Sequence, residues 1–546
     1  MYKSEKLKNL HFITNTIYEH YKKNLFLYYN YNIFRKKFIN IFIKFMNNNN
    51  SKDTSNKNTL INFFKENKLY FFAIHYYIFP KFTYDSKDDI INNRKYLIEN
   101  IDFLTDKFKI NLNKNLDLGL GITYPLSYQN MNNVHIFTEY CKLFRNLFPE
   151  LNYKSSHIEN IRNKKLINNS KIKIAFFSEY LISNHSVTRD RAGIIKNLSR
   201  DIFDIYLISF KNNISKSNLV KDLFNSIPEK KQIFLDKNIK NAQKIIASLE
   251  LDILIFCEIG MSFDAYLLAF SRLALIQCNT WGHSDTSGID TIDYFISSKL
   301  YELDFNESKK NYSEKLILTD NLCTYYYDPI EMYLNDYEKN NLLDRNYFNL
   351  PKDKNLYACL QSPFKITYEY DPILKKILQN DQDSLIIMID NEANILKNQV
   401  LPRFEKNLGK EMITRFKIFN KMSLYKFYSL FNNCDVALDS YPFGGCNTTF
   451  ECMSLNIPVI TLPSNFINGR FTYGIYKTMG IDELIAYDSN DYVNLAIQYA
   501  NDTTLRDKIC KKISENKNKI FMQKNSVNDW NILLEDLYLS HFNNGN

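Results

Sequence analysis

The chain has 546 residues, which is too long for one ordinary hydrophobic core, so we expect two or three domains. Hydrophobic residues make up 45% of the sequence and charged residues 24%, a balance that excludes a wholly disordered chain. The net charge of +9 is concentrated in residues 1–48, which hold nine Lys and Arg against two Glu. The rest is close to neutral, so we do not expect a nucleic-acid partner.

Residues 1–165 predict an all-helical domain. Apolar side chains recur three or four positions apart, as at Phe34, Phe38 and Ile41, and no glycine precedes Gly119. No repeat of about 34 residues is evident. Such a domain can dock an acceptor or serve as a scaffold. Its basic start suits an acidic partner or an anionic membrane surface, and a solvated helical face gives the same charge pattern.

The cysteines and the apolar stretches indicate the cellular compartment in which the protein is expected. Nine cysteines are scattered singly from Cys141 to Cys510, without a C-x-x-C pair, which is typical of a reducing environment. The polar start, Met1 to Glu5, lacks the apolar core of a signal peptide. The most apolar stretch, Leu69 to Phe79, is too short to span a bilayer. We therefore expect a cytoplasmic protein with no integral membrane segment.

From Lys171 onward, short apolar runs alternate with helical segments, which predicts βαβ units and parallel sheets. The runs lie at 171–178, 204–210, 252–258, 275–280 and 294–297, and again at 356–361, 384–390, 415–420, 435–440 and 458–463. The predicted fold class is α/β, with two tandem Rossmann-like, doubly wound domains. They cover residues 166–345 and 346–546, the second with C-terminal helices, and the segment 299–354 connects their sheets. Ligands are expected between the domains, at the carboxyl ends of the strands.

The most specific motif runs from Asp439 to Glu451, after a predicted strand and into a helix. Paired glycines let the backbone approach a ligand closely, and free amides at a helix start suit a diphosphate. The candidate donor-binding residues here are Gly444, Gly445, Asn447, Thr448, Thr449 and Glu451. The carboxylate of Glu451 can hold ribose hydroxyls. An ordinary turn with a capped helix gives the same pattern.

Two further loops of the second domain carry candidate groups for the same ligand. Gln361 and Lys365 follow the first strand, where a lysine can neutralise the charge that builds on a leaving nucleotide. Arg470 follows a later strand and can meet the diphosphate or an acceptor. A solvated lysine and a surface or salt-bridged arginine are the alternatives.

His185 and His283 both lie in loops that follow strands of the first domain. Histidine has the pKa range of a general base near neutrality, although a loop histidine can also be a structural hydrogen-bonding group. The sequence has no H-x-x-x-H, no Walker A loop and no G-x-S-x-G elbow. The D-x-D at Asp381 precedes a strand, at the wrong edge of the sheet. We therefore expect no catalytic metal and no cofactor.

Together these motifs resemble the bacterial SPINDLY-type relatives of protein O-GlcNAc transferase, with the protein N-glucosyltransferases of adhesin-modifying systems as more distant relatives. The resemblance covers roughly residues 170–515 and is most specific over 268–298 and 441–451. It implies a GT-B fold and inverting, metal-independent transfer of a sugar from a nucleotide carrier to a Ser, Thr or Asn side chain. GlcNAc or glucose on UDP is preferred, and GDP-fucose stays open.

The resemblance also implies roles for single residues. His185 matches the histidine near the acceptor that has been considered a base, and Lys365 matches the lysine that stabilises the departing diphosphate. His283 matches the W-G-H segment that lines the cleft. Asn447 stands at the phosphate-binding helix start, in place of the histidine of the animal enzymes. Phe471 departs from the pattern, because the residue after Arg470 is commonly histidine.

The implied partner is a protein acceptor, and a surface adhesin or flagellar protein is a candidate. Two alternatives stay open. GT-B architecture also serves glycan and lipid acceptors, and the fold can persist as a nucleotide-binding module without turnover.

Overall fold

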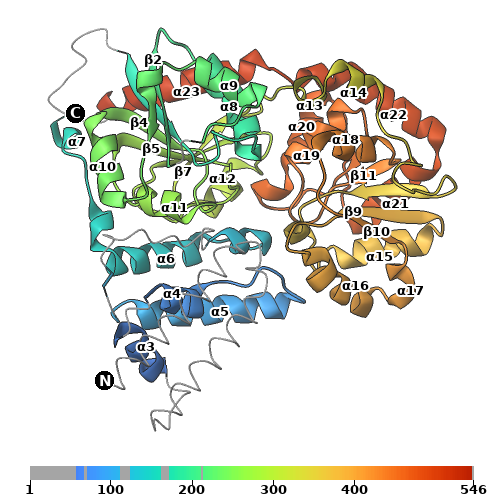
Figure 1. Ribbon diagram of the computed structural model, residues 1–546, viewed down its shortest axis with the longest axis horizontal. Helices are drawn as coiled ribbons and strands as arrows, with labels where there is room; N and C mark the ends of the chain where they lie inside the picture. Colours follow the sequence, from blue (N-terminus) through green and yellow to red (C-terminus); the bar gives the residue numbers. More distant parts are fainter. Residues whose placement is uncertain are drawn as a thin grey trace.

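The computed structural model describes residues 57–66, 70–107, 109–110, 123–160, 171–210 and 213–543 (Figure 1). The basic cluster within residues 1–48 and the helical spacing around Phe34 lie outside the described residues. Within these ranges the chain forms two α/β domains side by side, with a helical region below the first.

The first domain is built on a seven-stranded parallel sheet in the order β3-β2-β1-β4-β5-β6-β7. Its strands are β1 (Ile172–Phe177), β2 (Phe203–Ser209), β3 (Gln232–Phe234), β4 (Leu251–Phe256), β5 (Ala274–Thr280), β6 (Tyr294–Ser298) and β7 (Lys315–Thr319). The central strands are continuous apolar runs because helices cover both faces of the sheet.

The helices of this domain and its connector are α8 (Ser186–Asn197), α9 (Asn218–Asn225), α10 (Ile239–Ser248), α11 (Phe263–Ala269), α12 (Phe305–Ser308), α13 (Pro329–Tyr333) and α14 (Asp336–Asn340). Figure 1 shows α8 and α9 above the sheet, α11 below it and α10 at its left. The apolar side chains of β1 alternate between the two cores: Ile174 packs with α8 and α9, and Ala175 packs with α10 and α11.

The second domain has a five-stranded parallel sheet in the order β10-β9-β8-β11-β12. Its strands are β8 (Asn355–Cys359), β9 (Ser384–Ile389), β10 (Phe416–Phe419), β11 (Val436–Leu438) and β12 (Val459–Ile460). Its helices are α15 (Asp371–Asn380), α16 (Leu401–Asn407), α17 (Lys410–Ile413), α18 (Leu424–Asn432), α19 (Asn447–Ser454), α20 (Phe471–Met479), α21 (Ser489–Asn501) and α22 (Thr503–Asn516). The prediction of two doubly wound domains is confirmed.

Each of the ten predicted runs overlaps a strand, but two strands were missed. β3 and β7 are the edge strands of the first sheet, and β7 lies in the segment 299–354 that the sequence pattern treated as a connection. That interpretation was wrong for residues 315–319. An edge strand is short and half exposed, so its apolar run is weaker than that of a central strand.

The helical region comprises α3 (Lys57–Glu66), α4 (Tyr70–Ile78), α5 (Lys87–Leu104), α6 (Val134–Leu147) and α7 (His157–Asn160). Helix α6 lies against the underside of the first domain (Figure 1). There Phe144 makes edge contacts with Phe263, Tyr266 and Phe270, at ring-centroid distances of 5.6, 5.7 and 6.2 Å. This region is therefore joined to the α/β body by an aromatic core.

The last helix, α23 (Lys524–Asn543), returns to the first domain, although the sequence assigned residues 346–546 to the second. It packs against α8 and β7 and runs across the top of the first sheet in Figure 1. Trp530 is fully buried there, and its Nε1 donates to the carbonyl of Cys323 at 3.3 Å. Sequence order alone could not show on which domain this amphipathic helix would pack.

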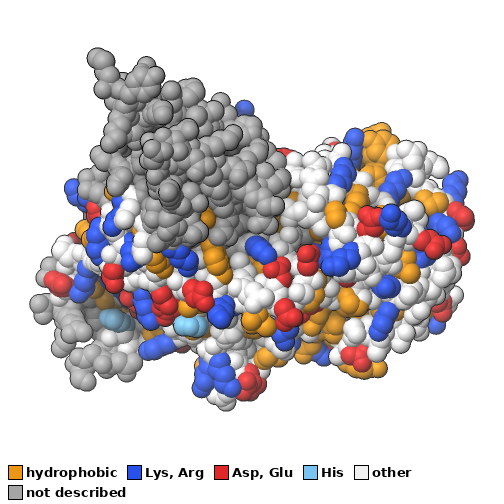
Figure 2. All heavy atoms as spheres, turned by 90° about the horizontal axis from the view of Figure 1, so that it is seen from below, with side chains coloured by type: hydrophobic (Ala, Val, Ile, Leu, Met, Phe, Trp, Pro, Cys, Tyr) orange, Lys and Arg blue, Asp and Glu red, His pale blue; other side chains and the backbone are white. Residues whose placement is uncertain are grey.

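Figure 2 shows Lys and Arg side chains interspersed with Asp and Glu over the described part of one face. In the described ranges, no helix has both the length and the apolar character that crossing a membrane requires.

The packing of α23 predicts a stability difference between two positions of that helix. We expect Trp530→Ala to lower the free energy of unfolding by about 3–5 kcal/mol, because it empties a buried aromatic site. Ile532, which is 60% exposed on the same helix, is the matched control, and Ile532→Ala should cost less than about 0.5 kcal/mol. Denaturant unfolding of both variants measures this, and equal effects would contradict the docking of α23.

Candidate functional site

Loops that follow β8 and β11 meet at the carboxyl edge of the second sheet, and the loop after β12 joins them where the amide of Gly444 donates to the carbonyl of Asn468 at 2.9 Å. Lys365 Nζ donates to the carbonyl oxygen of Gly444 at 2.6 Å and to Gln361 Oε1 at 3.2 Å. Gln361 Nε2 donates to Thr448 Oγ1 at 2.8 Å. The structure therefore brings Gln361, Lys365, Gly444 and Thr448 together, as expected for loops at the same end of parallel strands.

A buried carboxylate shapes the glycine turn. Asp439 Oδ1 accepts from the amide of Gly445 at 2.5 Å, and Oδ2 accepts from Thr461 Oγ1 at 2.8 Å. A Cβ atom on Gly444 would lie 2.9 Å from Asp439 Oδ2, and one on Gly445 would lie 2.4 Å from Thr448 Oγ1. Both glycines are thus needed for close packing. Asp439 was not predicted as a site residue, although an aspartate that ends a strand just before Gly-Gly is a usable signal.

Helix α19 begins at this turn without a side-chain cap. In the described part of the chain, no hydrogen bond engages the amides of Cys446, Asn447 and Thr448. Thr449 Oγ1 instead pairs with Thr472 Oγ1 at 2.8 Å. Uncapped amides at the positive end of a helix can bind an anion.

Lys365 supplies the cation beside this helix start. Its ammonium group lies 5.0 Å from the ring centroid of Phe443. Burial lowers the pKa of Lys365, and the nearby carboxylate of Asp439 opposes that shift. An anion bound at α19 would favour the charged form of the lysine, so lysine and helix start can act on one diphosphate.

Asn447 and Glu451 contact the first domain. Asn447 Oδ1 accepts from Tyr326 Oη at 2.6 Å, and its Nδ2 lies 3.3 Å from Asp190 Oδ1. Glu451 is 4% exposed and accepts from Arg189 at 2.7 Å. The carboxylate that the sequence suggested for ribose hydroxyls is therefore held in a buried ion pair between α8 and α19, a partner that lies 262 positions away in the chain.

Arg470 is 9% exposed and donates to backbone carbonyls on both sides of the domain boundary. Its Nε reaches the carbonyl of Tyr301 at 3.0 Å, and its Nη1 that of Ser464 at 3.3 Å. Phe471 packs against Trp281 and Tyr301, each with a ring-centroid distance of 4.9 Å. Arg470 is thus engaged by backbone carbonyls of both domains, a role that differs both from a free cation at the diphosphate and from the surface or salt-bridged arginine that was the alternative.

His185 is the N-cap of α8. Its Nδ1 accepts from the amide of Val187 at 3.3 Å, and its half-buried ring stacks on Tyr180 with centroids 4.2 Å apart. His283 is 5% exposed and stacks on Tyr124 at 5.3 Å. Both histidines thus follow strands at the carboxyl edge of the first sheet, β1 for His185 and β5 for His283.

The short 3-10 helix η2 (Tyr124–Tyr128) of the helical region lies between the two domains. On one side Tyr124 stacks on His283, and on the other Tyr128 stacks on Phe443 at 4.7 Å. Tyr128 also contacts Phe364 at 5.8 Å, next to Lys365 in sequence. We did not predict from the sequence that η2 forms a third wall of the site. The available signal was a pair of tyrosines four positions apart, Tyr124 and Tyr128, with Pro125 between them.

Among the described residues, no group of three or more His, Cys, Asp or Glu side chains could hold a metal ion. The D-x-D residue Asp381 accepts from Tyr357 Oη at 2.6 Å and is buried, so this aspartate has a structural partner.

Comparison with known proteins bears on the same region. Residues 335–529 match the profile of the family described as Glycosyl transferase family 41. The chain is 25% identical over 305 residues to a probable UDP-N-acetylglucosamine–peptide N-acetylglucosaminyltransferase SPINDLY of Eustoma exaltatum subsp. russellianum, covering 55% of this chain and 31% of that protein. It is 23% identical over 266 residues to the UDP-glucose:protein N-beta-glucosyltransferase of Actinobacillus pleuropneumoniae serotype 5b (strain L20), covering 47% and 40%.

The resemblance to SPINDLY-type proteins is confirmed. The chain spans only about a third of the length of the first of these curated relatives and two fifths of the second. A mutant of the Thermobaculum terrenum O-GlcNAc transferase superposes with a TM-score of 0.59 at 15% identity, covering 85% of this chain and 92% of that one. The predicted GT-B fold is thereby confirmed.

The ion pair between Arg189 and Glu451 predicts strong coupling. Glu451→Met alone leaves a guanidinium that is 11% exposed without its carboxylate and should cost about 3–5 kcal/mol of folding free energy. Arg189→Met with Glu451→Met should recover most of that loss, because two apolar side chains can fill the same space. A double-mutant cycle measured by denaturant unfolding tests this, and additive costs would show that the two groups do not interact.

Proposed function

We propose that the chain is a glycosyltransferase that moves GlcNAc or glucose from a UDP carrier onto a protein side chain. The reaction would invert the anomeric carbon and need no metal or cofactor. The acceptor would be a Ser, Thr or Asn side chain, with a surface adhesin or flagellar protein as a candidate target.

One observation carries this proposal: the convergence of Lys365, the Gly444–Gly445 turn and the uncapped start of α19 at one edge of the second sheet. Backbone amides and a lysine together neutralise a diphosphate, both bound and as a leaving group. Such a cradle provides the charge stabilisation that a metal provides in other transferases. The match of residues 335–529 to glycosyl transferase family 41 supports the same activity.

The proposed acceptor site is formed by the first domain, across from the glycine turn. His185 and His283 lie at the carboxyl edge of the first sheet, and η2 closes the space between His283 and Phe443. Holding donor and acceptor between the two edges would provide most of the acceleration, since it replaces a bimolecular encounter by an oriented one. Named relatives that act on peptides or proteins support a protein acceptor.

A cytoplasmic location is part of the proposal. All nine cysteines lie in the described part of the chain, and each is a free thiol. This agrees with a reducing compartment.

A panel of nucleotide sugars tests the donor. We expect UDP-GlcNAc or UDP-glucose to raise the free energy of unfolding by about 2.7 kcal/mol at a hundredfold excess over Kd, measured by thermal shift. With a labelled donor and cell lysate, label should enter material that protease digests. Label in protease-resistant glycan or lipid would favour the other acceptor class, and binding without sugar release would favour a non-catalytic module.

Lys365→Met tests the cradle, because methionine keeps an apolar stem against Phe443 while removing the charge and the hydrogen bonds to Gly444 and Gln361. We expect kcat to fall by about a hundredfold or more, with the free energy of unfolding lowered by about 1–3 kcal/mol because the Gly444 carbonyl loses its donor. Lys376→Met is the matched control, since that exposed lysine on α15 donates to Asn490 away from the turn. Turnover at the wild-type rate would remove Lys365 from the mechanism.

A further inference from the structure

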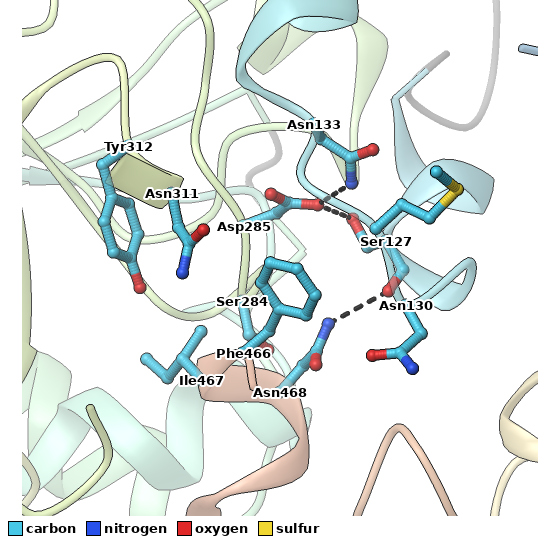
Figure 3. Close-up of a pocket in the computed structure, with 11 residues that line it drawn as sticks. Ser127, Asn130, Asn133, Ser284, Asp285, Asn311, Tyr312, Phe466, Ile467 and Asn468 are labelled. Atoms are coloured by element: carbon cyan, nitrogen blue, oxygen red, sulfur yellow. Dashed lines mark hydrogen bonds between the residues drawn. The ribbon is translucent and has the colours of Figure 1, made fainter. Parts of the chain in front are cut away.

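Ser127 lies at the centre of a hydrogen-bonded group that joins the helical region to the first domain. Its Oγ is 3.0 Å from His283 Nε2 and 2.7 Å from Asp285 Oδ2. Asn133 Nδ2 donates to the same carboxylate oxygen at 2.6 Å. Figure 3 shows Asp285 between Ser127 and Asn133 on the wall of a pocket that Asn468 of the second domain also lines.

The hydrogen-bond acceptors around Ser127 determine where its hydroxyl proton and the ring proton of His283 lie. Burial raises the pKa of Asp285 to about 6, and hydrogen bonds from Ser127, Asn133 and, at Oδ1, the amide of Thr286 at 2.9 Å oppose that shift, so the carboxylate is ionised near pH 7. A serine hydroxyl has one proton, and Ser127 gives it to Asp285. The contact between Ser127 and His283 must then use a hydrogen on Nε2 of the histidine.

His283 carries no second proton. Burial lowers its pKa to about 4, so the ring is neutral near pH 7 and its lone pair is on Nδ1. No hydrogen bond to Nδ1 is found within the described ranges of the chain. His185 differs, because its Nδ1 already accepts from the amide of Val187. Of the two histidines, His283 is therefore the one with an uncommitted imidazole lone pair.

The ring of His283 is also fixed in orientation. Tyr124 stacks on one face with an interplanar angle of 22°. Gly260, at φ +105°, lies beside the ring, and a Cβ atom there would be 2.7 Å from His283 Cδ2. Packing and hydrogen bonding thus specify one rotamer and one tautomer.

We propose that Ser127 and Asp285 are positioning residues that hold His283 as the Nε2-protonated tautomer and reserve its Nδ1 lone pair for the acceptor substrate. The substrate part rests on the proposed function, whereas the tautomer is a property of the free protein. In transfer, the acceptor oxygen or nitrogen bonds to the anomeric carbon and its proton passes to Nδ1. The bond from that carbon to the diphosphate oxygen breaks, and the diphosphate leaves with the electron pair. Asp285, through Ser127, stabilises the imidazolium that forms.

Nitrogen NMR of the full chain with ¹⁵N-labelled histidine tests the tautomer. His283→Gln identifies the signals, and we expect a protonated Nε2 and an unprotonated Nδ1 in the wild type. Ser127→Ala should give a mixture of tautomers, and Ser127→Thr, which keeps the hydroxyl, should restore the single form. A protonated Nδ1 in the wild type, or an unchanged tautomer in Ser127→Ala, would overturn the proposal.

Kinetics test the consequence for transfer. Ser127→Ala and Asp285→Asn should each lower kcat by about tenfold or more while KM for the nucleotide sugar stays within about twofold, with rescue by Ser127→Thr. Unchanged kcat in Ser127→Ala would remove the positioning role. If the wild type transfers no sugar, the proposed function fails while the NMR result still decides the tautomer.

Discussion

Asn447 joins the two α/β domains at the residue where helix α19 begins. Its side chain bonds Tyr326 and approaches Asp190, both of the first domain, while its backbone amide stands at the helix start. One turn further along, Glu451 pairs with Arg189. The start of α19 is therefore tied to the opposite wall, which belongs to the first domain. A ligand bound there would lie at the boundary between the two domains, which these side-chain contacts already hold in a fixed relative position.

Burial makes these cross-domain contacts sensitive to the charge of their side chains. Asp190 has its pKa raised to about 7 by burial, although Arg191 and Asn447 act in the other direction. Arg470 and Phe471 add carbonyl and aromatic contacts between the same domains. Asn447, Glu451 and Arg470, which the sequence predicted as donor-binding residues, thus contact the first domain in this structure.

The helical region is part of the site. Helix η2 places Tyr124 on His283 and Tyr128 on Phe443, and Ser127, between them in sequence, bonds His283 and Asp285. At the far side, Phe82 contacts Phe364 at 5.4 Å and Thr83 Oγ1 donates to Gln399 at 2.7 Å. The region therefore contacts both α/β domains. A change in its packing would alter the surroundings of both His283 and Lys365.

The sequence by itself determined the two parallel sheets and the loops that carry the candidate site. Central strands such as β1 and β8 are buried on both faces, so they appear as apolar runs, and the polar residues that follow them must lie at one edge. Edge strands β3 and β7 lack that signal. Only the tertiary structure decided the partners of Glu451 and Arg470, the place of α23, and the link from Ser127 to Asp285 across 158 positions. Those contacts depend on how separate elements pack, which local periodicity does not encode.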